Sequence, residues 1–161
     1  MLQRILIIAA SLAATGCATV MNESTQAIKI ETTTAAGEPV AGADCKLTND
    51  RENLSVKSGS TAEVRRSASD LDITCTHPDN PDASARAISR ANSGMFGNII
   101  IGGGIGALID HNKGTAYTYP TWIQLVFGKV MVFDRNAEKD SGPVAGEVTG
   151  ATTASTASRA P

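Results

Sequence analysis

Short runs of alternating apolar and polar residues, separated by turn residues, are the feature that most constrains the fold of this chain. The run "QAIKIETTT" places Ile28 and Ile30 on one face, and "DLDITCTH" does the same with Leu71, Ile73 and Cys75. Alternation with a period of two is typical of a half-buried strand. Several such runs with Gly and Pro between them are typical of an antiparallel sandwich or barrel. The sequence therefore predicts a mainly β fold, an antiparallel β-sandwich over residues 26–135.

The composition and motifs indicate no catalytic chemistry. The net charge is −2, which gives no basis for binding nucleic acid. Helix-spaced histidine pairs, C-x-x-C and G-x-S-x-G are absent from the sequence. In "HPDNPD", His77, Asp79 and Asp82 could hold a metal, but we prefer to interpret them as a polar turn. We therefore expect a protein that is not an enzyme and holds neither a metal nor a cofactor.

The first residues, "MLQRILIIAASLAATGC", have the pattern of a signal peptide over residues 1–16. Arg4 supplies the positive charge, and an apolar run and small residues follow. The four residues that end at Cys17 resemble the bacterial lipobox, whose cysteine is acylated, for example with palmitate. The alternative is an ordinary signal peptide with a chance cysteine. Two or three acyl chains would hold the protein firmly to a bilayer.

If Cys17 is acylated, the mature chain begins there and residues 17–25 form a tether. Ala18, rather than Asp, follows the cysteine, which resembles the signal for sorting to the outer membrane. We therefore expect a lipid anchor in the outer membrane, with the domain facing the periplasm or the cell surface.

The chain has three cysteines, an odd number for a secreted protein. With Cys17 acylated, Cys45 and Cys75 remain, and an oxidising periplasm favours their pairing. Such a bridge would stabilise the fold by about 3–4 kcal/mol. The alternative is two separate buried thiols.

Between Arg90 and Asp110 the chain carries no charge and is rich in glycine. A nucleotide-binding loop is one interpretation, but the flanking segments are β-like and no carboxylate follows at the required distance. The others are a membrane-associated helix of roughly 28 Å and an apolar helix or hairpin packed on the sandwich. We expect an apolar helical segment within residues 91–110. Small residues recur every four positions and would let another backbone approach closely: Gly94, Asn98, Gly102 and Gly106.

Two further regions complete the domain organisation. Tyr117, Tyr119 and Trp122 could line a ligand surface, lie at a headgroup interface or pack in the core. From Asn136 onward no aromatic residue or long apolar run remains. Such a composition cannot offset the entropy of ordering, so we expect residues 136–161 to form a disordered tail.

"GNIIIGGGIGALIDHNKGTAYTYP" and "GADCKL" are similar to segments of small bacterial surface lipoproteins with a PEGA-like β-sandwich. "VRRS" and the spacing of Leu71, Ile73 and Cys75 resemble their later strands. The Pro-Glu-Gly-Ala signature itself is absent. The resemblance covers about residues 17–127 and implies a sandwich with a Gly-rich hydrophobic segment, in families that mostly lack an assigned activity.

These observations predict an outer-membrane-anchored lipoprotein that acts as a non-enzymatic structural or binding module of the cell envelope. Its expected partners are the membrane, through the lipid, and an envelope protein or a second copy of the chain. The alternative is a glycine-zipper protein that associates with membranes or forms oligomers.

Overall fold

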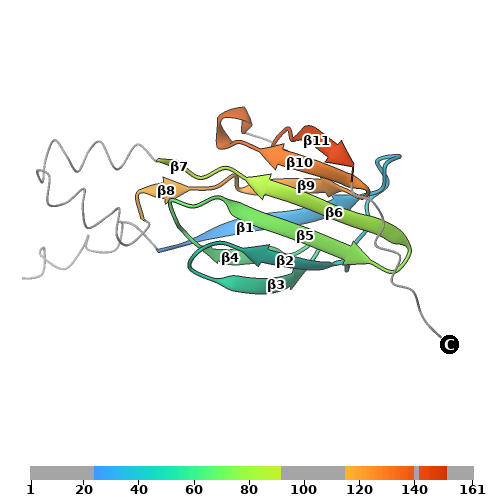
Figure 1. The fold of residues 1–161 in the computed structure, drawn as a ribbon, viewed down its shortest axis with the longest axis horizontal. Coiled ribbons are helices and arrows are strands. Elements are labelled where there is room, and N and C mark those ends of the chain that lie inside the picture. Colours follow the sequence, from blue (N-terminus) through green and yellow to red (C-terminus); the bar gives the residue numbers. More distant parts are fainter. Residues whose placement is uncertain (1–23, 92–114, 140–141, 152–161) are drawn as a thin grey trace, which may run out of the picture.

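The computed structural model describes residues 24–91, 115–139 and 142–151, which form a β-sandwich (Figure 1). One layer is a three-stranded sheet in the order β4-β1-β9, and the other is a six-stranded sheet in the order β11-β10-β6-β5-β2-β3. A two-stranded sheet pairs β7 with β8. The elements are β1 (Thr25–Thr33), β2 (Asp44–Thr48), β3 (Asn53–Lys57), β4 (Thr61–Arg65), β5 (Leu71–His77), β6 (Asn80–Ala87), β7 (Arg90–Ala91), β8 (Tyr117–Thr118), β9 (Trp122–Val126), β10 (Lys129–Phe133), the 3-10 helix η2 (Arg135–Ala137) and β11 (Glu147–Ala151).

The core lies between the two larger sheets and follows the alternation in the sequence. Ile28 and Ile30 of β1 are fully buried, and so are Ile123 and Leu125 of β9 in the same sheet. The opposite sheet contributes Leu71, Ile73 and Cys75 of β5, Leu47 of β2 and Phe133 of β10. The prediction of a mainly β sandwich is therefore confirmed.

Two strand pairs are parallel, whereas the sequence predicted an antiparallel sandwich. β1 pairs in parallel with β9, and β6 pairs in parallel with β10. The chain changes sheets at the turn after β9, where Gly128 has a φ of 79° that favours glycine. Alternation fixes which face of a strand is buried, but it carries no information on the direction of the neighbouring strand.

Residues 142–151 close one side of the sandwich, so the prediction that disorder begins at residue 136 is wrong for this part. Val144 is buried, and its N–H donates to the carbonyl oxygen of Trp122 over 2.9 Å. Glu147–Ala151 then forms β11, which pairs antiparallel with β10. Every residue of β11 is exposed. The segment is held by backbone pairing and one buried side chain, which leave no apolar pattern in the sequence.

Several predicted segments lie outside the described residues. These are the signal peptide, the tether up to residue 23, residues 92–114 and the tail from residue 152. Ala91, which the sequence placed at the start of the apolar helical segment, belongs to β7. Within residues 24–91, 115–139 and 142–151, no helix is long and apolar enough to span a membrane.

Candidate functional site

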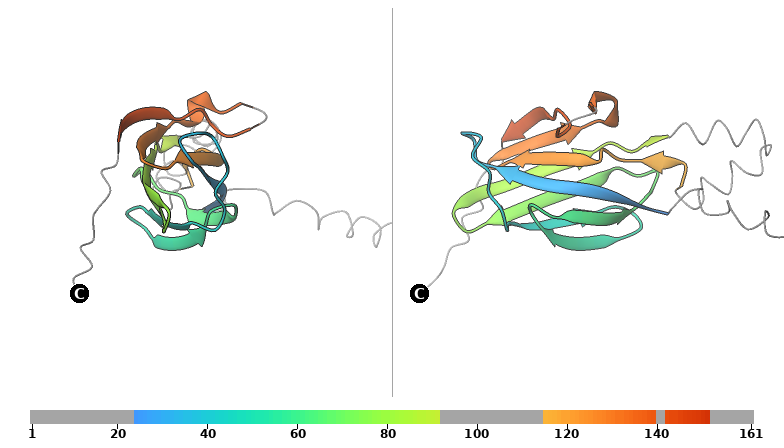
Figure 2. Two further views of the ribbon diagram at one scale, coloured as in Figure 1. Left: turned by 90° about the vertical axis from the view of Figure 1, so that its right-hand side faces the viewer. Right: turned by 180° about the vertical axis from the view of Figure 1, so that it is seen from behind.

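Three points where the chain enters or leaves the described fold converge on one end of the sandwich, which we call the entry end. They are the start of β1, the end of β7 and the approach to β8 (Figures 1 and 2). Ser24 is fixed there by its carbonyl oxygen, which accepts from the Arg66 N–H over 2.8 Å. β7 and β8 pair with Ala91 opposite Tyr117. The described strands on either side of residues 92–114 are therefore close together at this end.

A buried polar network around Tyr119 fixes the chain where it returns to the entry end. The Gln26 side chain bonds both backbone groups of Tyr119: Nε2 donates to the carbonyl oxygen over 2.7 Å, and Oε1 accepts from the N–H over 3.1 Å. The Tyr119 hydroxyl donates to the Ser69 carbonyl oxygen over 2.7 Å and accepts from Asn49 Nδ2 over 3.2 Å. Burial raises the pKa of Tyr119 to about 12, so the phenol stays neutral at ordinary pH.

Contacts of charged side chains at the entry end connect β7 to the residues that follow β10. Arg90 Nε donates to Asp134 Oδ1 over 3.1 Å, and its terminal nitrogen bonds the second carboxylate oxygen. Hydrogen bonds from Arg90 are the main cause that holds the pKa of Asp134 below its usual value. Arg135 donates to the Thr118 hydroxyl over 2.6 Å and lies 3.5 Å from Glu138. These contacts connect β7, β8 and η2 into one unit.

The structure brings together one pair of the residues that the sequence singled out. Cys45 of β2 and Cys75 of β5 are directly opposite in the antiparallel ladder, are buried and form a disulfide. The predicted disulfide is therefore confirmed. The acylation residue Cys17 and the helix-packing residues lie outside the described residues: Gly94, Asn98, Gly102 and Gly106.

The "HPDNPD" residues span the junction of β5 and β6: His77 ends β5, Pro78 and Asp79 form the turn, and Asn80–Asp82 begin β6. His77 Nδ1 accepts from the Asp79 N–H over 3.3 Å and lies 3.2 Å from Asn80 Nδ2. The Asp82 carbonyl oxygen accepts from the Gly128 N–H over 3.1 Å. In the described part of the chain, no three His, Cys, Asp or Glu side chains are grouped closely enough to hold a metal ion. The polar turn that the sequence predicted here is limited to Pro78 and Asp79.

The aromatic residues near the end of the chain take different roles. Tyr119 is in the core, whereas Trp122 is half-buried among polar residues of β1 and β9. The Lys29 ammonium nitrogen lies 4.0 Å from the centre of the Trp122 ring and 2.7 Å from Glu31 Oε1. Trp122 Nε1 donates to Glu31 Oε2 over 2.9 Å. We call Lys29, Glu31, Trp122 and Gln124 the tryptophan cluster.

Sequence reasoning missed the tryptophan cluster because it depends on strand pairing. Lys29 is opposite Trp122, and Glu31 is opposite Gln124, in the parallel register of β1 and β9. Hydrogen bonding by Lys29 is the largest cause that lowers the pKa of Glu31, with burial opposing it and Trp122 adding to it. The only hint in the sequence was the alternation of Lys29 and Glu31 with the isoleucines of β1, which places both charged residues on the same outer face of the strand.

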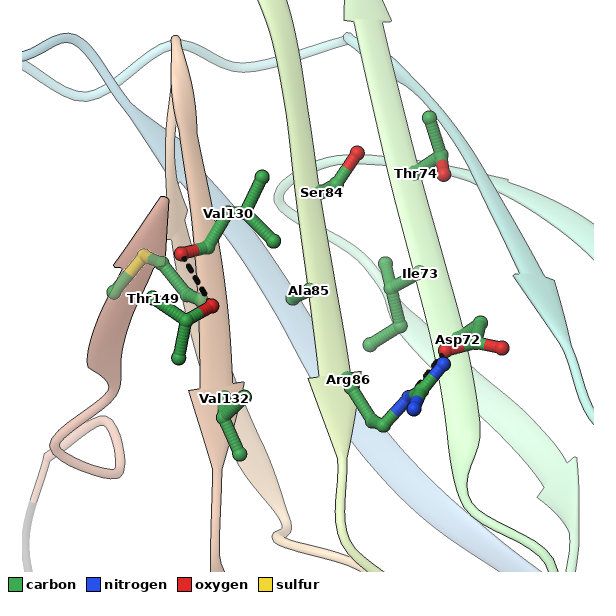
Figure 3. Close-up of a pocket in the computed structure, with 10 residues that line it drawn as sticks. Asp72, Ile73, Thr74, Ser84, Ala85, Arg86, Val130, Val132 and Thr149 are labelled. Carbon is green, nitrogen blue, oxygen red and sulfur yellow. Dashed lines mark hydrogen bonds and ion pairs between the residues drawn. The ribbon is translucent and has the colours of Figure 1, made fainter. Parts of the chain in front are cut away.

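A shallow groove of about 450 Å³ crosses β5, β6, β10 and β11 (Figure 3). Val130 and Val132 line it on β10, next to Thr149 of β11, whose hydroxyl donates to the Val130 carbonyl oxygen over 3.2 Å. Arg86 and Asp72 form an exposed ion pair of 2.9 Å on its other side. The lining is thus mixed, with an apolar part and a polar part.

No protein-family model, curated protein or solved structure matches this chain. Functional inference therefore depends on the residues and contacts described above.

Proposed function

We propose that this protein is a non-enzymatic lipoprotein of the outer membrane, anchored through acylated Cys17 and acting as a structural or binding module of the cell envelope. The observation that supports this most is the convergence of the chain at the entry end. The start of β1, the end of β7 and the start of β8 lie there (Figure 1). A lipid at Cys17 and an apolar segment that leaves at the same end would both be directed toward one bilayer.

The length of the tether supports this orientation. Cys17 precedes Ser24 by seven residues (24 − 17), which span at most about 25 Å even when fully extended. An acylated Cys17 would therefore keep the entry end within that distance of the membrane surface. Polar side chains at this end have partners within the fold: Arg90 bonds the Asp134 carboxylate, and Gln26 bonds the backbone of Tyr119. Such an arrangement suits a rigid support.

The test is the fate of the protein when the acylated thiol is removed. Cys17→Ser should block acylation and processing, so the protein should leave the membrane fraction or keep its full precursor mass. The matched control is the double variant Cys45→Ala/Cys75→Ala, which removes both other cysteines and should remain in membranes with the acylated mass. Cell fractionation and mass spectrometry of both variants make the measurement. Unchanged fractionation and mass of Cys17→Ser would show that the protein is not a lipoprotein.

A second candidate is a glycine-zipper protein that associates with membranes or with copies of itself. The four-residue recurrence of small residues between Arg90 and Asp110 favours it. If another backbone approaches Gly106 closely, Gly106→Leu should be more harmful than Ile100→Leu, which nearly conserves volume. Thermal stability and membrane partition of the two variants measure this. Equal tolerance would contradict close packing at Gly106.

A further inference from the structure

The tryptophan cluster surrounds one positively charged nitrogen. The Lys29 ammonium lies over the face of the Trp122 ring, 4.0 Å from its centre, and contacts Glu31 Oε1 at 2.7 Å. An aromatic face attracts cations through its quadrupole, and a carboxylate beside it adds a direct charge. Together they have the chemistry of a site that recognises an alkylammonium group.

The parts of this site are held in place without help from Lys29. The second carboxylate oxygen of Glu31 accepts from Trp122 Nε1 over 2.9 Å and from Gln124 Nε2 over 3.4 Å. Both partners lie on β9, which is paired with β1 along this stretch. The carboxylate and the ring are therefore oriented by two paired strands, so the site would persist if the lysine moved away.

Lys29 can move away from the tryptophan cluster, and a cavity beside the cluster can receive a ligand. The Lys29 side chain is 41% exposed, against 26% for Glu31, so its contacts compete with water. A cavity of about 190 Å³ adjoins the cluster and is lined by Glu31 and Gln124. The rest of its lining comes from β1, the loop after β1 and the turn before β4: Thr32, Pro39, Val40, Ala41 and Gly59. This cavity could accept the part of a ligand that follows its ammonium group.

We propose that the tryptophan cluster binds a lysine side chain of a partner protein, which takes the position that Lys29 occupies in the free protein. The occupant is a lysine because the position already accepts the ammonium group of one. Lys29 then acts as an internal competitor that keeps the site closed to weak ligands. This inference does not depend on the lipid anchor, since the cluster belongs to the sandwich itself.

The chain contains a single tryptophan, so its fluorescence reports on this site alone. The probe is N-acetyl-lysine methylamide, titrated into the full-length chain in a nonionic detergent. Lys29→Met removes the competing charge but keeps an apolar stem. If Lys29 occupies the site for about nine-tenths of the time in the wild type, this variant should bind the probe about tenfold more tightly. Lys46→Met is the matched control, because Lys46 is an exposed lysine in the middle of β2, in the sheet opposite the cluster. It should behave as the wild type does, and Lys29→Met/Glu31→Gln should lose the gain.

A second measurement needs no variant. In the wild-type chain, the indole N–H resonance of Trp122 should move with excess probe and stay in place with N-acetyl-norleucine methylamide, which lacks the ammonium group. Equal affinity of Lys29→Met and the wild type, or an unmoved indole resonance, would overturn the inference. Tighter binding of phosphoethanolamine than of the lysine probe to Lys29→Met would also overturn it, because the occupant would then be a lipid headgroup.

Discussion

Gly146 belongs to residues 142–151, which we call the closing segment because they cover one side of the sandwich. Adding one methyl group at Gly146 should loosen that segment. A Cβ at this position would lie 2.4 Å from Phe133 Cε1 and 2.7 Å from Phe133 Cζ. The Phe133 ring is fully buried and cannot move aside easily. The Cβ would also lie 2.7 Å from Met131 Cε, which is flexible. Gly146→Ala must therefore displace the backbone of the segment.

The cost follows from two limiting outcomes. If the segment stays in place, the overpacking costs about 1–3 kcal/mol. If it lifts away, the burial of Val144 is lost, which is worth about 1.5–3 kcal/mol. Either outcome predicts a loss of about 2 kcal/mol in the free energy of unfolding. The melting temperature should then fall by roughly 5–10 °C.

Gly150→Ala is the matched control in the same segment. A Cβ at Gly150 would meet Val130 Cβ at 3.7 Å, an ordinary contact. This change should therefore be neutral or slightly stabilising, because alanine restricts the unfolded chain. Thermal unfolding followed by circular dichroism gives the stabilities, and hydrogen exchange of the β11 amides shows whether the segment has lifted. If the two variants melt together and exchange alike, residues 142–151 do not cover Phe133 as described.

Two further predictions concern stability. Replacing Cys45 and Cys75 together with alanine should cost about 3–4 kcal/mol in denaturant unfolding, because the bridge closes a loop over a sequence separation of 30; a loss below 1 kcal/mol would contradict this. The raised pKa of Tyr119, about 12, means that its contribution to stability is complete below pH 10 and is lost as pH rises through 12. Tyr119→Phe should flatten the decline in stability above pH 10 by about 1–2 kcal/mol; equal pH profiles of this variant and the wild type would refute the assignment.

The sequence predicts those parts of the fold in which the local pattern and the tertiary structure agree. Alternation in β1 and β5 identified their buried faces, and the position of Cys45 and Cys75 in strand-like runs allowed the disulfide. The parallel pairing of β1 with β9 could not be predicted, because it joins segments far apart in the chain. The tryptophan cluster depends on that pairing, so Lys29 and Trp122 gave no signal of being neighbours.

The closing segment illustrates a different limit. Composition after Asn136 favours disorder because it offers little apolar surface. In the fold, however, β11 adds backbone hydrogen bonds to an existing strand, and the single side chain of Val144 fills the open side. Ordering this segment therefore depends on a template formed by β9 and β10, which no local pattern reports.

The pairing of β7 with β8 has a consequence for how much the domain can vary. Ala91 and Tyr117 face each other, so residues 92–114 connect two strands that are already paired. The entropy of closing a flexible loop grows only with the logarithm of its length, about 0.6 kcal/mol for each doubling. Replacing the segment with a short turn, or with a longer insertion, should thus change the stability of the sandwich by only a few kcal/mol. The pairing of β7 with β8 should then persist when the length of the segment between them is changed.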